Sequence, residues 1–204
     1  TTVSITANNG GVGTTNATEI SAGDTVAVNS STAGGNIALR NVAATDMQLG
    51  QLNAGNGSVT LTNATADAGF IDDNAGSNNV TASSLTVDTA NAAEFGSTAD
   101  QLEIAVNTLS IGATNAVTTV GVTNTGDLDI TRINATGQVD VDATGLIEAV
   151  DIDTTNDQID LTSSGNSIRV DDVNAGTGAV NISANGSISD DLDAGTDITG
   201  GAVS

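Results

Sequence analysis

The chain of 204 residues carries 25 acidic residues, three arginines and no histidine, for a formal charge of -22. It also lacks cysteine, which excludes disulfide scaffolds and Cys/His zinc sites, and the absence of histidine excludes Ser-His-Asp and Cys-His triads. Three arginines do not form the basic face that nucleic acid requires, and no apolar run approaches the ~18 residues of a membrane-spanning helix.

Short apolar pairs with period two recur along the whole chain, which is the pattern of strands with one buried face. Gly, Asn, Asp, Ser and Thr separate the pairs and are typical of turns. The sequence therefore predicts an all-β chain of about twenty short strands. In chain order the pairs are Val3/Ile5, Val26/Val28, Ile37/Leu39, Val59/Leu61, Leu85/Val87, Leu102/Ile104, Leu109/Ile111, Val120/Val122, Leu128/Ile130, Val139/Val141, Val150/Ile152, Ile159/Leu161, Ile168/Val170 and Val180/Ile182.

The pairs repeat with a period near twenty residues, in two columns of equivalent positions. The first column is Val59, Val80, Leu102, Val120, Val139, Ile159 and Val180. The second column is Leu85, Leu109, Leu128, Val150, Ile168 and Ile188. A repeat of this length predicts a solenoid in which the residues of one column stack on one another. We expect Val139, Ile159 and Val180 to lie in one inward column.

A longer motif recurs in Met47–Gly57, Leu128–Gly137 and Ile168–Gly178, where a strand is followed by Asn-Ala and then glycine. Glycine and asparagine suit corners that need a positive φ, and equivalent asparagines could stack into a ladder. These features predict a parallel β-helix of about ten coils of roughly 20 residues. A β-sandwich is the competing fold, since it also uses short strands at similar spacing, but it does not predict one corner motif three times. The solenoid is the favoured interpretation.

The segments Val139–Ile147 and Val180–Ile188, with the pattern Val-x-Ile/Val-x-Ala-x-Gly-x-Ile, resemble the repeats of filamentous-haemagglutinin-like exoproteins. That resemblance, clearest over residues 37–190, implies a right-handed β-helical shaft, an extracellular location at the bacterial surface and an adhesive or structural role. The family's secretion domain carries proline-containing motifs, and this chain has no proline. We therefore expect residues 1–204 to be one solenoid segment, either of a larger extracellular protein or of a repeating fibre.

Acidic residues are concentrated in residues 127–204, which hold 15 of the 25. In the proposed register Asp140 lies one coil from Asp160, and two neighbouring carboxylates are the oxygen ligands that Ca²⁺ prefers. Asp140 and Asp160 are therefore candidate Ca²⁺ ligands. The alternative, which we favour, is a solvated acidic face that keeps a secreted rod soluble, with no cofactor. By the same columns, Arg169 should pair with Asp151 on the preceding coil.

Catalysis is not expected. A polysaccharide-cleaving site needs aromatic side chains for sugar stacking, and Phe70 and Phe95, the only two aromatics, are better explained as core residues. We expect a structural shaft or filament segment whose partners are further copies stacked end to end. The alternative is an adhesin that binds a glycan or a surface receptor through a side face, stiffened by Ca²⁺.

Overall fold

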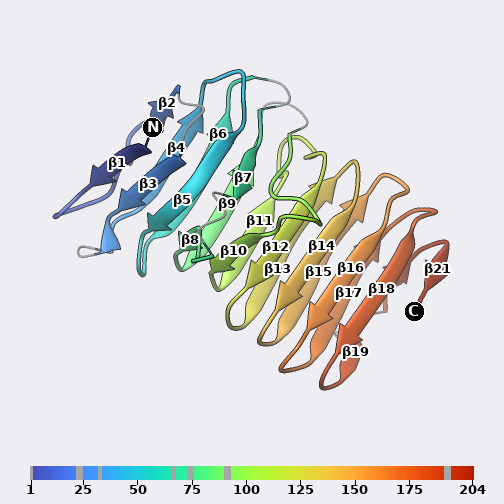
Figure 1. Ribbon diagram of the computed structural model, residues 1–204. Helices are drawn as coiled ribbons and strands as arrows, with labels where there is room; N and C mark the ends of the chain where they lie inside the picture. The colour runs from blue at the N-terminus through green and yellow to red at the C-terminus, as the bar shows by residue number, and fades with distance from the viewer. Residues whose placement is uncertain are drawn as a thin grey trace.

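The computed structural model describes residues 2–21, 25–31, 34–65, 68–72, 76–89, 93–190 and 194–204. Over these ranges the chain winds into about nine stacked coils, and every strand pairing is parallel (Figure 1). The predicted all-β parallel solenoid is confirmed, with about nine coils where the sequence predicted ten. No helix in the described ranges is long and apolar enough to cross a membrane.

Two sheets run the length of the stack, and most successive strands of the chain alternate between them. Sheet A contains, in spatial order, β1 (Thr2–Thr6), β3 (Thr25–Asn29), β5 (Met47–Asn53), β8 (Val80–Thr81), β10 (Leu102–Ala105), β12 (Val120–Asn124), β14 (Val139–Ala143), β16 (Ile159–Ser163), β18 (Ala179–Ala184) and β21 (Ala202–Val203), with β7 (Phe70–Asp72) also pairing with β5. Sheet B contains β2 (Thr18–Ile20), β4 (Ile37–Asn41), β6 (Ser58–Asn63), β9 (Ser84–Asp88), β11 (Thr108–Ile111), β13 (Leu128–Ala135), β15 (Ile147–Thr154), β17 (Ile168–Asn174) and β19 (Ile188–Asp190), with β20 (Ile198–Thr199) also pairing with β17.

The inward residues of successive coils form a continuous dry core. Val139 pairs with Ile159 and Ile159 with Val180, and all three are fully buried, as predicted. Phe70 and Phe95 are also fully buried and meet edge to face with ring centroids 6.4 Å apart, which confirms their assignment to the core. The matched spacing of the coils therefore gives a core side chain such as Ile159 an apolar neighbour on the coil above and on the coil below.

The predicted columns are correct in part. From Val120 to Val180 the first column is correct, but Val59 belongs to sheet B, opposite Leu85. In the second column Leu128 pairs with Ile147, so the inclusion of Val150 was wrong. The remaining errors are that Val80 pairs with Ile104, Leu102 with Val122 and Leu109 with Ile130.

A bend within the long strands causes the error at Val150. Alternation counted back from Ile152 would turn Val150 inward, and alternation counted forward from Ile147 would turn Asp151 inward. Instead Val150 and Asp151 both face out, and the inward series resumes at Ile152. β13 and β17 bend at the corresponding place, so their inward residues follow an i, i+2, i+5 spacing. The recurring motif is this bent strand with its following corner. Its first copy is in sheet A and the other two are in sheet B, so the three copies do not form one column.

The Asn-Ala-x-Gly corners follow the predicted chemistry. Asn53 Oδ1 accepts from Gly55 N at 3.1 Å, and Asn174 Oδ1 accepts from Gly176 N at 3.0 Å. Both glycines have φ of 56°, where a Cβ atom would be strained. The ladder of motif asparagines is interrupted, because Asp153 lies in register between Asn134 and Asn174.

Buried asparagines do stack elsewhere, between β4 and β6. Asn41 pairs with Asn63, and both side chains are buried. Their amides donate to Thr45 O at 3.0 Å and to Ala68 O at 2.8 Å, so each asparagine satisfies the backbone of its own corner.

Candidate functional site

The predicted carboxylate pair lies on the outer face of sheet A. Asp140 on β14 is directly opposite Asp160 on β16, one coil away, and Asn181 on β18 continues the row. Asp140 and Asp160 line one shallow hollow together with Asn181 and neighbouring residues of β16 and β18. The sequence therefore placed the two carboxylates correctly relative to each other.

Amide groups surround Asp160 rather than further carboxylates. Gln158 Nε2 and Gln138 Nε2 donate to its Oδ2 at 2.6 and 3.2 Å, and Asn181 Nδ2 donates to its Oδ1 at 2.7 Å. These three donors offset part of the repulsion between stacked carboxylates without a cation. The glutamines were missed from the sequence, although Gln138 and Gln158 occupy the same place, directly before a strand, in consecutive coils.

Asp140 is harder to ionise than an ordinary aspartate. Partial burial, followed by the negative charges of Asp142 and Asp160, raises its pKa, while a hydrogen bond with Gln101 acts in the opposite direction. Within the described ranges no three His, Cys, Asp or Glu side chains are arranged to hold a metal ion. The row thus offers carboxylate and amide oxygens on an open face, and the Ca²⁺ role of Asp140 and Asp160 stays a prediction.

All three arginines lie on sheet B, and each pairs with an acid on an adjacent coil. Arg40 Nη1 is 2.9 Å from Glu19 Oε1, and Arg132 Nη1 is 3.1 Å from Asp151 Oδ2. Asp151 nevertheless has a raised pKa, because partial burial and the nearby charges of Asp153 and Asp172 outweigh the attraction of Arg132.

The predicted pairing of Arg169 with Asp151 is wrong. Arg169 is directly opposite Glu148 and forms an ion pair with it, whereas Asp151 lies opposite Asp172 and pairs with Arg132. The cause is the bend at Val150, which shifts the register beyond it. Reading Ile147–Ile152 with the i, i+2, i+5 spacing of the neighbouring copies would have placed Glu148 beside Arg169.

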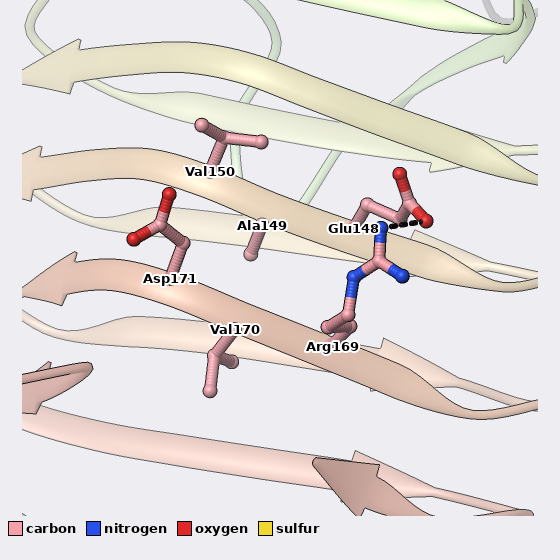
Figure 2. Close-up of a pocket in the computed structure, with 6 residues that line it drawn as sticks. All are labelled: Glu148, Ala149, Val150, Arg169, Val170 and Asp171. Atoms are coloured by element: carbon pink, nitrogen blue, oxygen red, sulfur yellow. Dashed lines mark hydrogen bonds and ion pairs between the residues drawn. The ribbon is translucent and has the colours of Figure 1, made fainter. Parts of the chain in front are cut away.

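The bend leaves a small hollow on sheet B, lined by Glu148, Ala149, Val150, Arg169, Val170 and Asp171. Figure 2 shows Val150 and Asp171 projecting at the bends of neighbouring strands, while Arg169 turns toward Glu148. Val150 is 39% exposed. The hollow combines the apolar side chains of Ala149, Val150 and Val170 with charges of both signs.

Comparison with protein families, with curated proteins and with solved structures finds no match for this chain. The class of protein is therefore defined by the fold alone: a parallel β-solenoid repeat protein with an acidic surface.

Proposed function

We propose that this chain is a segment of a stiff shaft in a secreted bacterial surface protein, with a mechanical and non-catalytic role. The observation that carries the proposal is the unbroken stack of coils. One cluster of buried residues extends from Val12 to Ile182, and the strands of both sheets follow one another without interruption. Ten strands spaced ~4.8 Å apart give sheet A a length of roughly 43 Å.

The regular hydrogen bonding between coils supports stiffness. Bending the rod would stretch backbone hydrogen bonds and separate core residues on the outer side of the curve at the same time. The bacterial surface location draws on the resemblance of Val139–Ile147 and Val180–Ile188 to filamentous-haemagglutinin-like exoproteins. The acidic outer face agrees with a rod that must stay dispersed in water.

Deletion of one whole coil distinguishes the shaft role from the adhesin role. Because Val139 and Ile159 are equivalent positions, deletion of residues 139–158 joins Gln138 to Ile159 and preserves the core column. A shaft segment should fold and lose only one strand spacing, about 4.8 Å, from its length. If the intact chain binds a glycan array and the deletion variant does not, the side-face adhesin is the better explanation.

Location needs its own test. Antibodies against the folded chain should label intact cells of the source bacterium, and external protease should remove the signal. Labelling that appears only after the cells are made permeable would contradict the proposed role.

A further inference from the structure

Three asparagines of the chain are followed directly by glycine: Asn9, Asn56 and Asn185. In such a pair the backbone nitrogen of the glycine can attack the side-chain amide carbon of the asparagine, because glycine has no side chain to obstruct the approach. By sequence alone the three pairs are equivalent. All three asparagines are exposed in corners between strands, so a difference between them has to come from the glycine.

Hydrogen bonds hold the backbone amides of two of these glycines. Gly57 N donates to Ala54 O at 2.9 Å, and Gly186 N donates to Asn166 O on the preceding coil at 2.8 Å. An amide held in this way must first lose its hydrogen bond before it can attack, which requires local opening of the coil. Gly10 N, in contrast, has no hydrogen-bond partner among the residues that the structure describes.

The space around the glycines sets the same pair apart. A Cβ atom placed on Gly57 would lie 2.7 Å from Gly35 O, and one placed on Gly186 would lie 2.5 Å from Ser167 Oγ, so both glycines are packed against a neighbouring coil. A Cβ atom placed on Gly10 would meet no atom within 4 Å. The ring that joins an asparagine side chain to the next nitrogen needs room around the glycine, and of the three pairs Gly10 alone offers it.

We propose that Asn9 is a site of spontaneous modification to aspartate and isoaspartate, whereas the fold protects Asn56 and Asn185. Gly10 N attacks Asn9 Cγ, and the new N–Cγ bond replaces the Cγ–Nδ2 bond. The side-chain nitrogen leaves as ammonia and takes the proton that Gly10 N loses. Water then opens the resulting succinimide ring: attack at Cγ gives aspartate, and attack at the Asn9 backbone carbonyl carbon gives isoaspartate, whose main chain runs through the former side chain.

The product changes the main chain next to contacts between two coils. Both products add a negative charge, and isoaspartate also adds one methylene to the main chain. The carbonyl of Gly10 packs against the next coil, where a Cβ atom placed on Gly35 would lie 2.3 Å from its oxygen. Val12 N donates to Asn36 O on that coil at 2.8 Å. Lengthening the chain just before these contacts should loosen this corner of the stack. The chemistry does not depend on the proposed shaft role.

Peptide mapping of the folded chain after incubation at mildly alkaline pH tests the assignment. Incubation in heavy-oxygen water labels the carboxyl group that ring opening forms, and digestion in ordinary water leaves any later reaction unlabelled. We expect label to appear at Asn9 at least about tenfold faster than at Asn56 or Asn185. An opening free energy of about 1.4 kcal/mol is sufficient for this ratio, because the protected pairs react only through the open state.

Unfolding in urea supplies the matched control within the same chain. There the three asparagines should be labelled at similar rates, because each is followed by an unrestrained glycine. Asn9→Gln should remove the fast signal from the folded chain, since its ring would be one atom larger and forms more slowly. An Asn9 that stays unlabelled in the folded chain, or labelling of Asn56 or Asn185 at the same rate, would overturn the proposal. The same order of rates in urea as in the folded chain would also overturn it, because the selectivity would then come from the sequence.

Discussion

The bend in the long strands predicts losses of stability of very different size for two apolar residues that lie two positions apart. Ile152 is fully buried between Ile133 and Val173, while Val150 is 39% exposed at the bend. Ile152→Ala removes three buried carbons, worth about 2.4 kcal/mol of transfer free energy at ~0.8 kcal/mol each. The cavity adds to this loss, because the backbone ladders on both sides hold the coils apart, so we expect about 3–4 kcal/mol in total.

Val150→Ala is the matched control, because it ends in the same residue on the same strand. It removes two carbons from a partly solvated position, so the unfolding free energy should fall by about 1 kcal/mol or less. Urea unfolding with a common m-value measures both variants, and the larger loss should lower the thermal midpoint by about 2–4 °C per kcal/mol. Equal losses, or a larger loss for Val150→Ala, would show that strict alternation continues through β15 and that the bend is wrong.

Three further predictions concern the charged faces. Burial and like charges raise the pKa values of Asp140 and Asp151 in the folded state, so folding takes up protons. The thermal midpoint should therefore rise as the pH falls from 7 toward 3.8, the ordinary pKa of an aspartate, and a midpoint that falls throughout this window would contradict the assigned causes. A double-mutant cycle on Glu148 and Arg169 at low salt should give a coupling energy of about 0.2–1 kcal/mol, and the same cycle on Asp151 and Arg169 should give none. Coupling to Asp151 and none to Glu148 would support the pairing predicted from the sequence. Ca²⁺ should raise the thermal midpoint no more than Mg²⁺ does, and a Ca²⁺-specific rise that Asp140→Asn or Asp160→Asn abolishes would establish the calcium site instead.

The sequence was sufficient for the fold class because core alternation and corner chemistry are both local. Val139, Ile159 and Val180 stack as expected, and Gly55 and Gly176 adopt the positive φ predicted for corners. Each of these features depends on residues a few positions apart, or on a spacing of about twenty, and both kinds of pattern can be read directly from the chain.

Register across the bends was harder to predict. Val150 has the residue type of a core position, and only comparison with the neighbouring coils shows that two successive side chains face out there. A register error of one or two residues is sufficient to predict the wrong ion-pair partner for Arg169. The amide donors around Asp160 depend in turn on side-chain positions across three coils, which periodicity alone does not specify.

Distances between spin labels test the central claim, the parallel stack of coils, most directly. Ala27, Asp140 and Asn181 all face outward on sheet A, with five strand spacings from the first to the second and seven to the third. At ~4.8 Å per spacing, Ala27→Cys/Asp140→Cys and Ala27→Cys/Asn181→Cys should differ by about 10 Å, at roughly 24 and 34 Å. Dilution with unlabelled chain removes distances between copies. Equal distances for the two pairs, or a shorter distance to Asn181, would contradict the solenoid.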